Sequence, residues 1–120
     1  LRKRFGNRVK PLEWTKRNDQ LSECELLVNT TSLGMKGQED LQIDLTMLAP
    51  KAVVTDIVYV PLRTKLLAAA AARGNPVVEG LGMLLHQAVR GFELWFGVRP
   101  AVTIELHDLI ARDIDPGYKT

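Results

Sequence analysis

The sequence predicts one α/β domain in which short parallel strands alternate with helices. Three short apolar runs, rich in branched aliphatic residues, have the pattern of buried parallel strands. They cover residues 25–29, 52–57 and 77–78. Helical patterns lie between and after these runs at short intervals, as βαβ units require. A chain of 120 residues is within the usual size of a single domain.

The first part of the chain carries weaker signals. The first residues have the pattern of a last helical turn that stops at Gly6. Residues 9–14 are a weak strand candidate interrupted by a proline. A short polar helix is expected next, capped by Asn18 or Asp19 and ending near Cys24.

The middle of the chain is predicted from its turn and capping residues. The strand at 25–29 leads into a loop at 30–39. We expect a helical turn at 44–48, capped by Asp44 and stopped by Pro50. The second strand, 52–57, follows this turn.

The last three helices are predicted from caps and periodicity. Thr64 is expected to cap a helix that runs through an alanine-rich segment and ends at Gly74. Residues 81–96 form the strongest helix candidate, terminated by Gly97, because apolar residues recur at three- and four-residue spacing. That stripe comprises Leu81, Leu84, Leu85, Ala88, Phe92 and Trp95. Thr103 is expected to cap a final helix.

Composition excludes several classes of protein. With 46% apolar and 25% charged residues, the chain resembles a soluble globular protein and not a disordered one. A net charge of +2 is too small to predict a nucleic-acid or membrane partner. A single cysteine excludes an internal disulfide and fits a reducing compartment, and no apolar run approaches the roughly 18 residues of a membrane span. We therefore expect a cytoplasmic location.

Unusual residues gather in the loops that follow the three predicted strands. In parallel sheets, ligands bind outside the carboxyl ends of the strands, and these loops share one edge. Thr30, Thr31 and Ser32, with Met35 nearby, suit a wall that contacts a polar cofactor through hydroxyl and backbone N–H groups. The alternative interpretation is an ordinary hydroxyl-rich turn.

Two further polar residues are candidates for contacts with a substrate. Tyr59 follows the second strand, where its hydroxyl would hydrogen-bond a substrate; alternatively its ring lies in the core. Gln87 lies off the apolar stripe on the same helix face as Gly80 and Met83, and alternatively it is simply solvated. Asp56 stands near the end of the same strand, and its ordinary interpretation is a hydrogen-bond acceptor in a cap or a turn.

The sequence lacks the usual signatures of other chemistries. It contains no Gly-x-Gly-x-x-Gly loop, Walker sequence or paired-cysteine metal site, and no credible Ser/His/Asp arrangement. His86 and His107 have no acidic or cysteine partner at metal-ligand spacing, so no metal site is predicted.

Three separated stretches together resemble the carboxyl-terminal half of shikimate dehydrogenase. They are Asn-Thr-Thr-Ser-Leu-Gly-Met at 29–35, Asp-Ile-Val-Tyr-Val-Pro at 56–61, and Gly-Leu-Gly-Met-Leu-Leu-His-Gln-Ala at 80–88, with Phe-Glu-Leu-Trp at 92–95. The resemblance covers about residues 1–97 of the domain at 1–120. Residues 98–120 are a terminal helix and tail.

Members of this family reduce 3-dehydroshikimate to shikimate with NADPH in the biosynthesis of aromatic amino acids. They combine an amino-terminal substrate domain with a carboxyl-terminal Rossmann-like domain. The resemblance therefore implies a partial Rossmann-like domain here, NADP as cofactor, and shikimate or 3-dehydroshikimate as substrate. It implies that Tyr59 and Gln87 contact the substrate, and that Ile57, Gly80, Met83, Thr30, Thr31 and Ser32 contact the cofactor.

The chain also departs from the family pattern. Thr30, Val60 and Glu79 stand where the family more often has alanine, asparagine, and aspartate or asparagine. The family's catalytic lysine/aspartate pair, glycine-rich phosphate loop and 2′-phosphate-binding segment would all precede residue 1. The resemblance therefore implies a piece of a longer enzyme that needs its amino-terminal domain, has no catalytic residue of its own and is inactive alone.

Two alternatives stay open at the level of sequence. One is a stand-alone, non-catalytic α/β module that binds a partner or small molecule, and the other is a relative that uses quinate. If part of the sheet is absent, an uncovered sheet edge and apolar faces predict self-association or partial unfolding.

Overall fold

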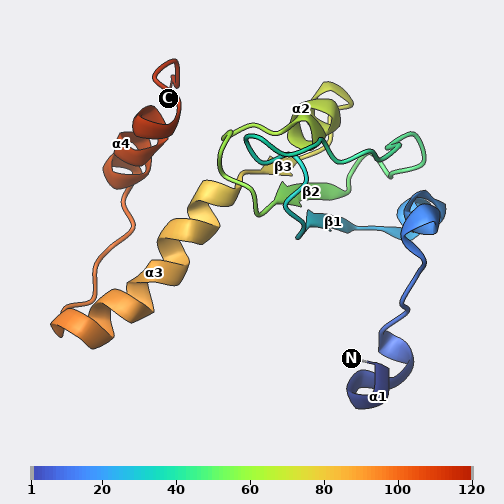
Figure 1. Cartoon of the computed structure of the whole chain (residues 1–120), viewed down its shortest axis with the longest axis horizontal. Helices are drawn as coiled ribbons and strands as arrows, with labels where there is room; N and C mark the ends of the chain where they lie inside the picture. Colours follow the sequence, from blue (N-terminus) through green and yellow to red (C-terminus); the bar gives the residue numbers. More distant parts are fainter. Residues whose placement is uncertain (1, 120) are drawn as a thin grey trace.

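The computed structural model describes residues 2–119 and is built on a three-stranded parallel sheet (Figure 1). The strands are β1 (Leu26–Asn29), β2 (Val53–Asp56) and β3 (Val77–Val78), in the order β1-β2-β3. Asn29 pairs in register with Asp56, and Thr55 with Val78, so all three strands end at one edge of the sheet. The predicted α/β fold with short parallel strands is confirmed.

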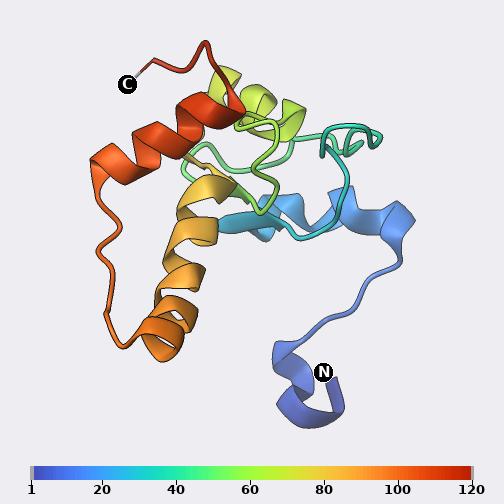
Figure 2. The same ribbon diagram turned by 60° about the vertical axis from the view of Figure 1, so that its left-hand side comes forward.

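Helices surround this sheet unevenly. They are α1 (Arg2–Phe5), the 3-10 helices η1 (Gly6–Arg8) and η2 (Trp14–Glu23), α2 (Lys65–Ala72), α3 (Gly80–Phe96) and α4 (Ile104–Ile114). Helix α2 packs on β2 and β3, and α4 packs on α3. Figure 2 shows α1 lying apart from the sheet at the end of an extended segment.

The predicted helix ends of the second half are confirmed. The Thr64 hydroxyl accepts a hydrogen bond from the Leu67 N–H (3.4 Å), and that of Thr103 accepts one from the Leu106 N–H (3.2 Å), as N-caps do. Helix α3 ends at Gly97, whose φ of 69° is left-handed, so a residue without Cβ suits this position.

The predictions for the first part were partly wrong. Residues 9–13 are irregular, because no described strand lies beside them and a strand needs a hydrogen-bonded neighbour. Helix η2 begins at Trp14, where the Arg17 guanidinium lies 4.9 Å from the ring centroid and donates to the Trp14 carbonyl. Asn18 therefore lies inside η2, and its side chain accepts from the Asp44 N–H (3.3 Å) instead of capping the helix.

The segment at 44–48 is a turn, whereas a helical turn was predicted there. The Asp44 carboxylate accepts hydrogen bonds from the N–H and the hydroxyl of Thr46, at 2.9 and 2.5 Å. Asp44 thus forms an Asx turn, in which the side chain, instead of a backbone carbonyl, accepts the hydrogen bond from the N–H two residues further on.

The apolar core consists of two separate clusters. The larger cluster lies between the sheet and α2 and includes Leu21, Leu48, Val54 and Leu67. The smaller one joins the beginning of α3 to α4 and is formed by Leu62, Leu81 and Ala111, with half-buried residues around them. The second cluster holds α4 against the site described below.

The apolar stripe of α3 is buried only at its beginning. Leu81 is buried and Leu84 and Leu85 are half-buried, but Phe92 and Trp95 are 42% and 80% exposed. Figure 1 shows the second half of α3 projecting away from the sheet. The helix predicted from this stripe is confirmed, but only its first turns pack against the core.

No helix within residues 2–119 has the length and apolar character needed to cross a bilayer.

Candidate functional site

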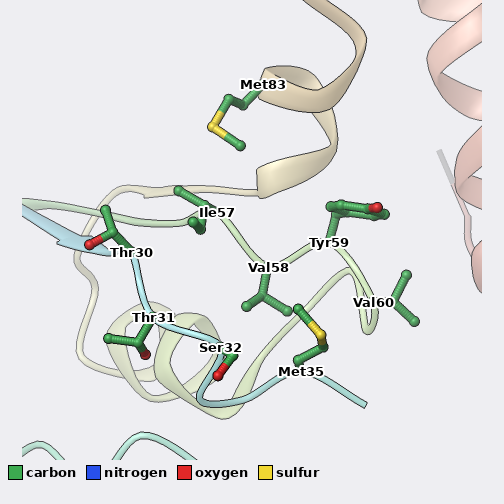
Figure 3. A pocket seen from close by; sticks show the side chains of 9 residues that line it. All are labelled: Thr30, Thr31, Ser32, Met35, Ile57, Val58, Tyr59, Val60 and Met83. Carbon is green, nitrogen blue, oxygen red and sulfur yellow. The ribbon is translucent and has the colours of Figure 1, made fainter. Parts of the chain in front are cut away.

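A pocket of about 450 Å³ opens at the carboxyl edge of the sheet (Figure 3). It is lined by Thr30, Thr31, Ser32, Met35, Ile57, Val58, Tyr59, Val60 and Met83. The lining comes from the loop after β1, the loop after β2 and the first turns of α3. Six of the eight residues predicted to bind substrate or cofactor are thus brought together; Gly80 and Gln87 are not in the lining.

The loop after β1 forms one wall and is held by the side chain at the end of its strand. The Asn29 side-chain oxygen accepts hydrogen bonds from the N–H (3.0 Å) and the hydroxyl (2.8 Å) of Thr31. The Thr31 hydroxyl in turn accepts from the Leu33 N–H (3.1 Å). Thr30 and Ser32 on either side are exposed, so their hydroxyls are accessible to a ligand.

The loop after β2 forms the opposite wall. The Ile57 N–H donates to the backbone carbonyl of Asn29 (3.1 Å), which continues the sheet pairing one residue beyond β2. Tyr59 is half-buried and packs against the cluster formed by Leu62 and Leu81, while it also lines the pocket. The ring of Tyr59 thus contacts the core, as the alternative interpretation had it, and a substrate contact by its hydroxyl stays a prediction. The loop turns at a cis peptide bond between Val60 and Pro61.

The first turns of α3 complete the pocket. Figure 3 shows the Met83 side chain reaching from α3 toward Ile57. Its side chain is 44% exposed, and a flexible thioether at such a position adapts to a flat ring. Gln87 is exposed and lies four residues after Met83, on the same face of α3.

The structure shows why position 80 is a glycine, which the sequence alone did not predict. A Cβ at Gly80 would lie 2.7 Å from the carbonyl oxygens of both Asp56 and Val58. Only a glycine lets α3 begin directly against the end of β2. The space that a side chain at position 80 would need is thus taken by the chain's own backbone, and the cofactor contact that the resemblance implies for Gly80 stays a prediction.

A buried polar cluster behind the pocket was also missed. Asn29, Asp56 and Thr64 are at most 3% exposed and hydrogen-bond one another. The available signal was that two adjacent strands each end in a polar residue. Asp56 is the turn acceptor that the sequence suggested, since its carboxylate accepts from the Val58 N–H (3.0 Å), but its bonds to Asn29 and Thr64 were not predicted.

The pocket suits binding more than acid–base chemistry. None of its lining residues is an acid, a base or a histidine. Hydroxyl groups on one side and apolar side chains on the other fit a ligand that combines sugar hydroxyls with a flat ring. Within residues 2–119, no group of three or more His, Cys, Asp or Glu side chains is placed to hold a metal ion.

Comparison of sequences relates this chain to one family. Residues 80–104 match the model of the Shikimate 5'-dehydrogenase C-terminal domain. Shikimate dehydrogenase (NADP(+)) of Rhodopseudomonas palustris (strain TIE-1) is 62% identical over 116 residues, which are 97% of this chain and 42% of that protein. That of Nitrobacter hamburgensis is 61% identical over 114 residues, 95% of this chain and 40% of that protein.

Comparison with solved structures points to the same family as the comparison of sequences. Shikimate 5-dehydrogenase of Thermus thermophilus, in complex with NADP(H) and shikimate, matches with a TM-score of 0.72 and 30% identity over 94% of this chain and 40% of that one. Quinate dehydrogenase of Corynebacterium glutamicum, in complex with NAD, matches with a TM-score of 0.68 and 33% identity, over 78% of this chain and 33% of that one. The resemblance and the partial Rossmann-like fold are thus confirmed, and the chain spans about two fifths of the relatives' length.

Proposed function

We propose that this chain, which matches the carboxyl-terminal part of shikimate dehydrogenases, forms the nicotinamide side of an NADP site. The enzyme containing it would catalyse the reversible NADPH-dependent reduction of 3-dehydroshikimate to shikimate, in the biosynthesis of aromatic amino acids. One observation carries this proposal: loops far apart in sequence meet in one uncharged pocket at the carboxyl edge of a parallel sheet.

The residues of the chain would bind and orient the two ligands. Bound NADPH supplies the hydride for the reaction. Thr30, Thr31 and Ser32 would lie along the cofactor, and Ile57 would contact its nicotinamide side through the backbone. Met83 would pack near the nicotinamide. Gly80 would act close to the cofactor through its backbone, since it brings the beginning of α3 against residues 56–58.

Two side chains would contact the substrate. The Tyr59 hydroxyl and the Gln87 amide would hydrogen-bond shikimate or 3-dehydroshikimate. Tyr59 lines the pocket, and Gln87 lies beyond it on the same face of α3 as Met83. An exposed amide next to a nicotinamide pocket is well placed to meet a substrate that lies between this chain and a second domain.

The proposal includes an amino-terminal domain of the same enzyme as the partner. We assign no catalytic residue to this chain and expect it to be inactive alone, in the cytoplasm with the rest of the enzyme. The exposed apolar end of α3 is consistent with contact to another surface. When produced without such a surface, we expect the chain to self-associate.

The proposal is tested with a chimera in which this chain replaces the matching segment of the Rhodopseudomonas palustris relative, which is 62% identical. Steady-state kinetics would compare the chimera with its Gln87→Ala, Tyr59→Phe and His86→Ala variants. Gln87→Ala should raise KM for shikimate by about tenfold or more, as loss of one good hydrogen bond in a site does, and change KM for NADP little. Tyr59→Phe should act in the same direction.

The control is His86→Ala, because His86 is an exposed neighbour on the same helix that does not line the pocket. It should leave both Michaelis constants unchanged. An unchanged shikimate constant in Gln87→Ala would remove Gln87 from the site. A chimera without NADP-dependent turnover would favour a non-catalytic binding module, and turnover of quinate with NAD in preference to shikimate with NADP would favour the quinate-using alternative.

A further inference from the structure

We propose that the buried cluster of Asn29, Asp56 and Thr64 positions both walls of the pocket, with Asp56 as its central positioning residue. This inference rests on the proposed function, since it concerns how tightly the pocket holds NADP. None of the three side chains lines the pocket, so the effect would act through residues that do.

Asp56 connects three separate segments through a single carboxylate. One of its oxygens accepts hydrogen bonds from the Asn29 amide and from the Val58 N–H, both at 3.0 Å. The other accepts from the Thr64 hydroxyl at 2.7 Å. These donors come from the end of β1, the loop after β2 and the N-terminus of α2.

Each partner of Asp56 also holds part of the surrounding structure. The Asn29 amide donates to the Leu33 carbonyl (2.9 Å), and its oxygen accepts from Thr31, so Asn29 fixes both ends of the loop at 30–33. Val58 belongs to the opposite wall, and Thr64 is the N-cap of α2. Bonds that meet at Asp56 thus tie the two walls together, in addition to the backbone bond from the Ile57 N–H to the Asn29 carbonyl (3.1 Å).

Because the cluster is buried, its polar atoms depend on one another for hydrogen bonds. Asn29, Asp56 and Thr64 are 3%, 1% and 1% exposed, and within residues 2–119 no ion pair involves Asp56. A buried carboxylate without a cation depends on well-aligned hydrogen-bond donors. If one partner is lost, the remaining polar atoms must move toward water or toward other partners, and the loops that carry them move too.

The test uses the chimera described above and measures NADPH dissociation constants by cofactor fluorescence, together with KM for each substrate. Asp56→Ala and Thr64→Val should each weaken NADPH binding by about tenfold, as expected for lost hydrogen bonds to a charged group. KM for shikimate and kcat should change less. Thr64→Ser retains the hydroxyl and should restore NADPH binding to within about twofold of the original.

A matched control separates positioning from general loss of stability. Asn75 is also buried, and its amide donates to the carbonyls of Ala49, Pro50 and Ala52, but it precedes β3 and lies away from the carboxyl edge. Asn75→Ala should lower Tm without changing the NADPH dissociation constant. Equal weakening in Asn75→Ala and Asp56→Ala would overturn the positioning role, as would unchanged NADPH binding in Thr64→Val.

Hydrogen exchange gives a readout that needs neither turnover nor cofactor. The N–H groups of Thr31 and Val58 donate into the cluster, so Asp56→Ala should speed their exchange while Asn75→Ala does not. Unchanged exchange at both amides in Asp56→Ala would overturn the inference by itself. If the unsubstituted chimera failed to bind NADPH although these amides were protected, the proposed function and the cluster's role in cofactor binding would fail, and only the geometry would stand.

Discussion

The carboxyl edge of the sheet and the outer half of α3 invert the usual distribution of residues in opposite ways. At the sheet edge, polar side chains are buried: Asn29, Asp56 and Thr64 are at most 3% exposed. At the end of α3, large apolar side chains are open to solvent: Leu94, Trp95 and Phe96 are 67%, 80% and 64% exposed.

The two regions differ in whether the described chain itself supplies the contacts that their side chains need. The buried polar groups at the sheet edge bond one another, so this region is complete within the described chain. The apolar side chains at the end of α3 are mostly uncovered by the rest of residues 2–119. The first region is therefore expected to respond to substitution through stability and ligand binding, and the second through association.

The largest expected effect comes from Gly80→Ala. Its Cβ would meet the carbonyl oxygens of Asp56 and Val58 at 2.7 Å, and backbone cannot move aside as a flexible side chain does. We expect the free energy of unfolding to fall by about 3 kcal/mol, with loss of NADP binding. Urea denaturation of this chain measures the first effect.

The control for this substitution is Gly82→Ala, two residues further along α3. A Cβ there would meet nothing within 4 Å. Since alanine favours a helix over glycine, this variant should gain about 0.5 to 1 kcal/mol. A similar loss in both variants would show that the close approach at Gly80 does not decide stability.

The next largest effect distinguishes two N-caps of the same chemistry. Thr64 caps α2 and also donates to Asp56, whereas Thr103 caps α4 at an exposed position. Thr64→Ala should cost about 2 kcal/mol, and Thr103→Ala about 1 kcal/mol, because only the first also breaks a buried bond to a carboxylate. Chemical denaturation of the two variants side by side checks this order, and equal costs would contradict it.

Substitutions in the outer half of α3 should change self-association and leave the stability of the fold almost unchanged. Trp95→Ser should change the free energy of unfolding by less than about 0.5 kcal/mol, as exposed substitutions usually do, while it reduces self-association. Sedimentation velocity measures the association. Ile104→Ser is the control, since Ile104 is 73% exposed on α4; an equal reduction there would show that association is not specific to α3.

The smallest effect concerns acid stability at the turn formed by Asp44. Hydrogen bonds from the Thr46 hydroxyl and N–H lower the pKa of Asp44 below its ordinary value of 3.8. Folding thus favours the carboxylate, so the contribution is present above the unfolded pKa and is lost as pH falls through the lower, folded pKa. Asp44→Asn should flatten the decline in stability below about pH 4, measured by acid titration of circular dichroism.

Much of the site was predictable because its signals are local. The hydroxyls of Thr30, Thr31 and Ser32 follow one apolar run and Tyr59 follows another, and parallel strands place both loops at one edge. The roles of these residues toward NADP and shikimate remain predictions, for which the kinetics of the chimera are the test. The cluster of Asn29, Asp56 and Thr64 was not predictable, because each residue has an ordinary local explanation as a strand end, a turn acceptor or a cap.

By itself, the sequence determined the α/β class, the three strands, the caps of α2 and α4, and the end of α3, since each depends on residues only a few positions apart. Tertiary structure alone decided which residues meet. The bond between Asn29 and Asp56 joins positions 27 residues apart and follows from the register of β1 with β2. The need for glycine at Gly80 and the exposure of Trp95 likewise depend on which surfaces lie opposite them, and periodicity along a chain does not contain that information.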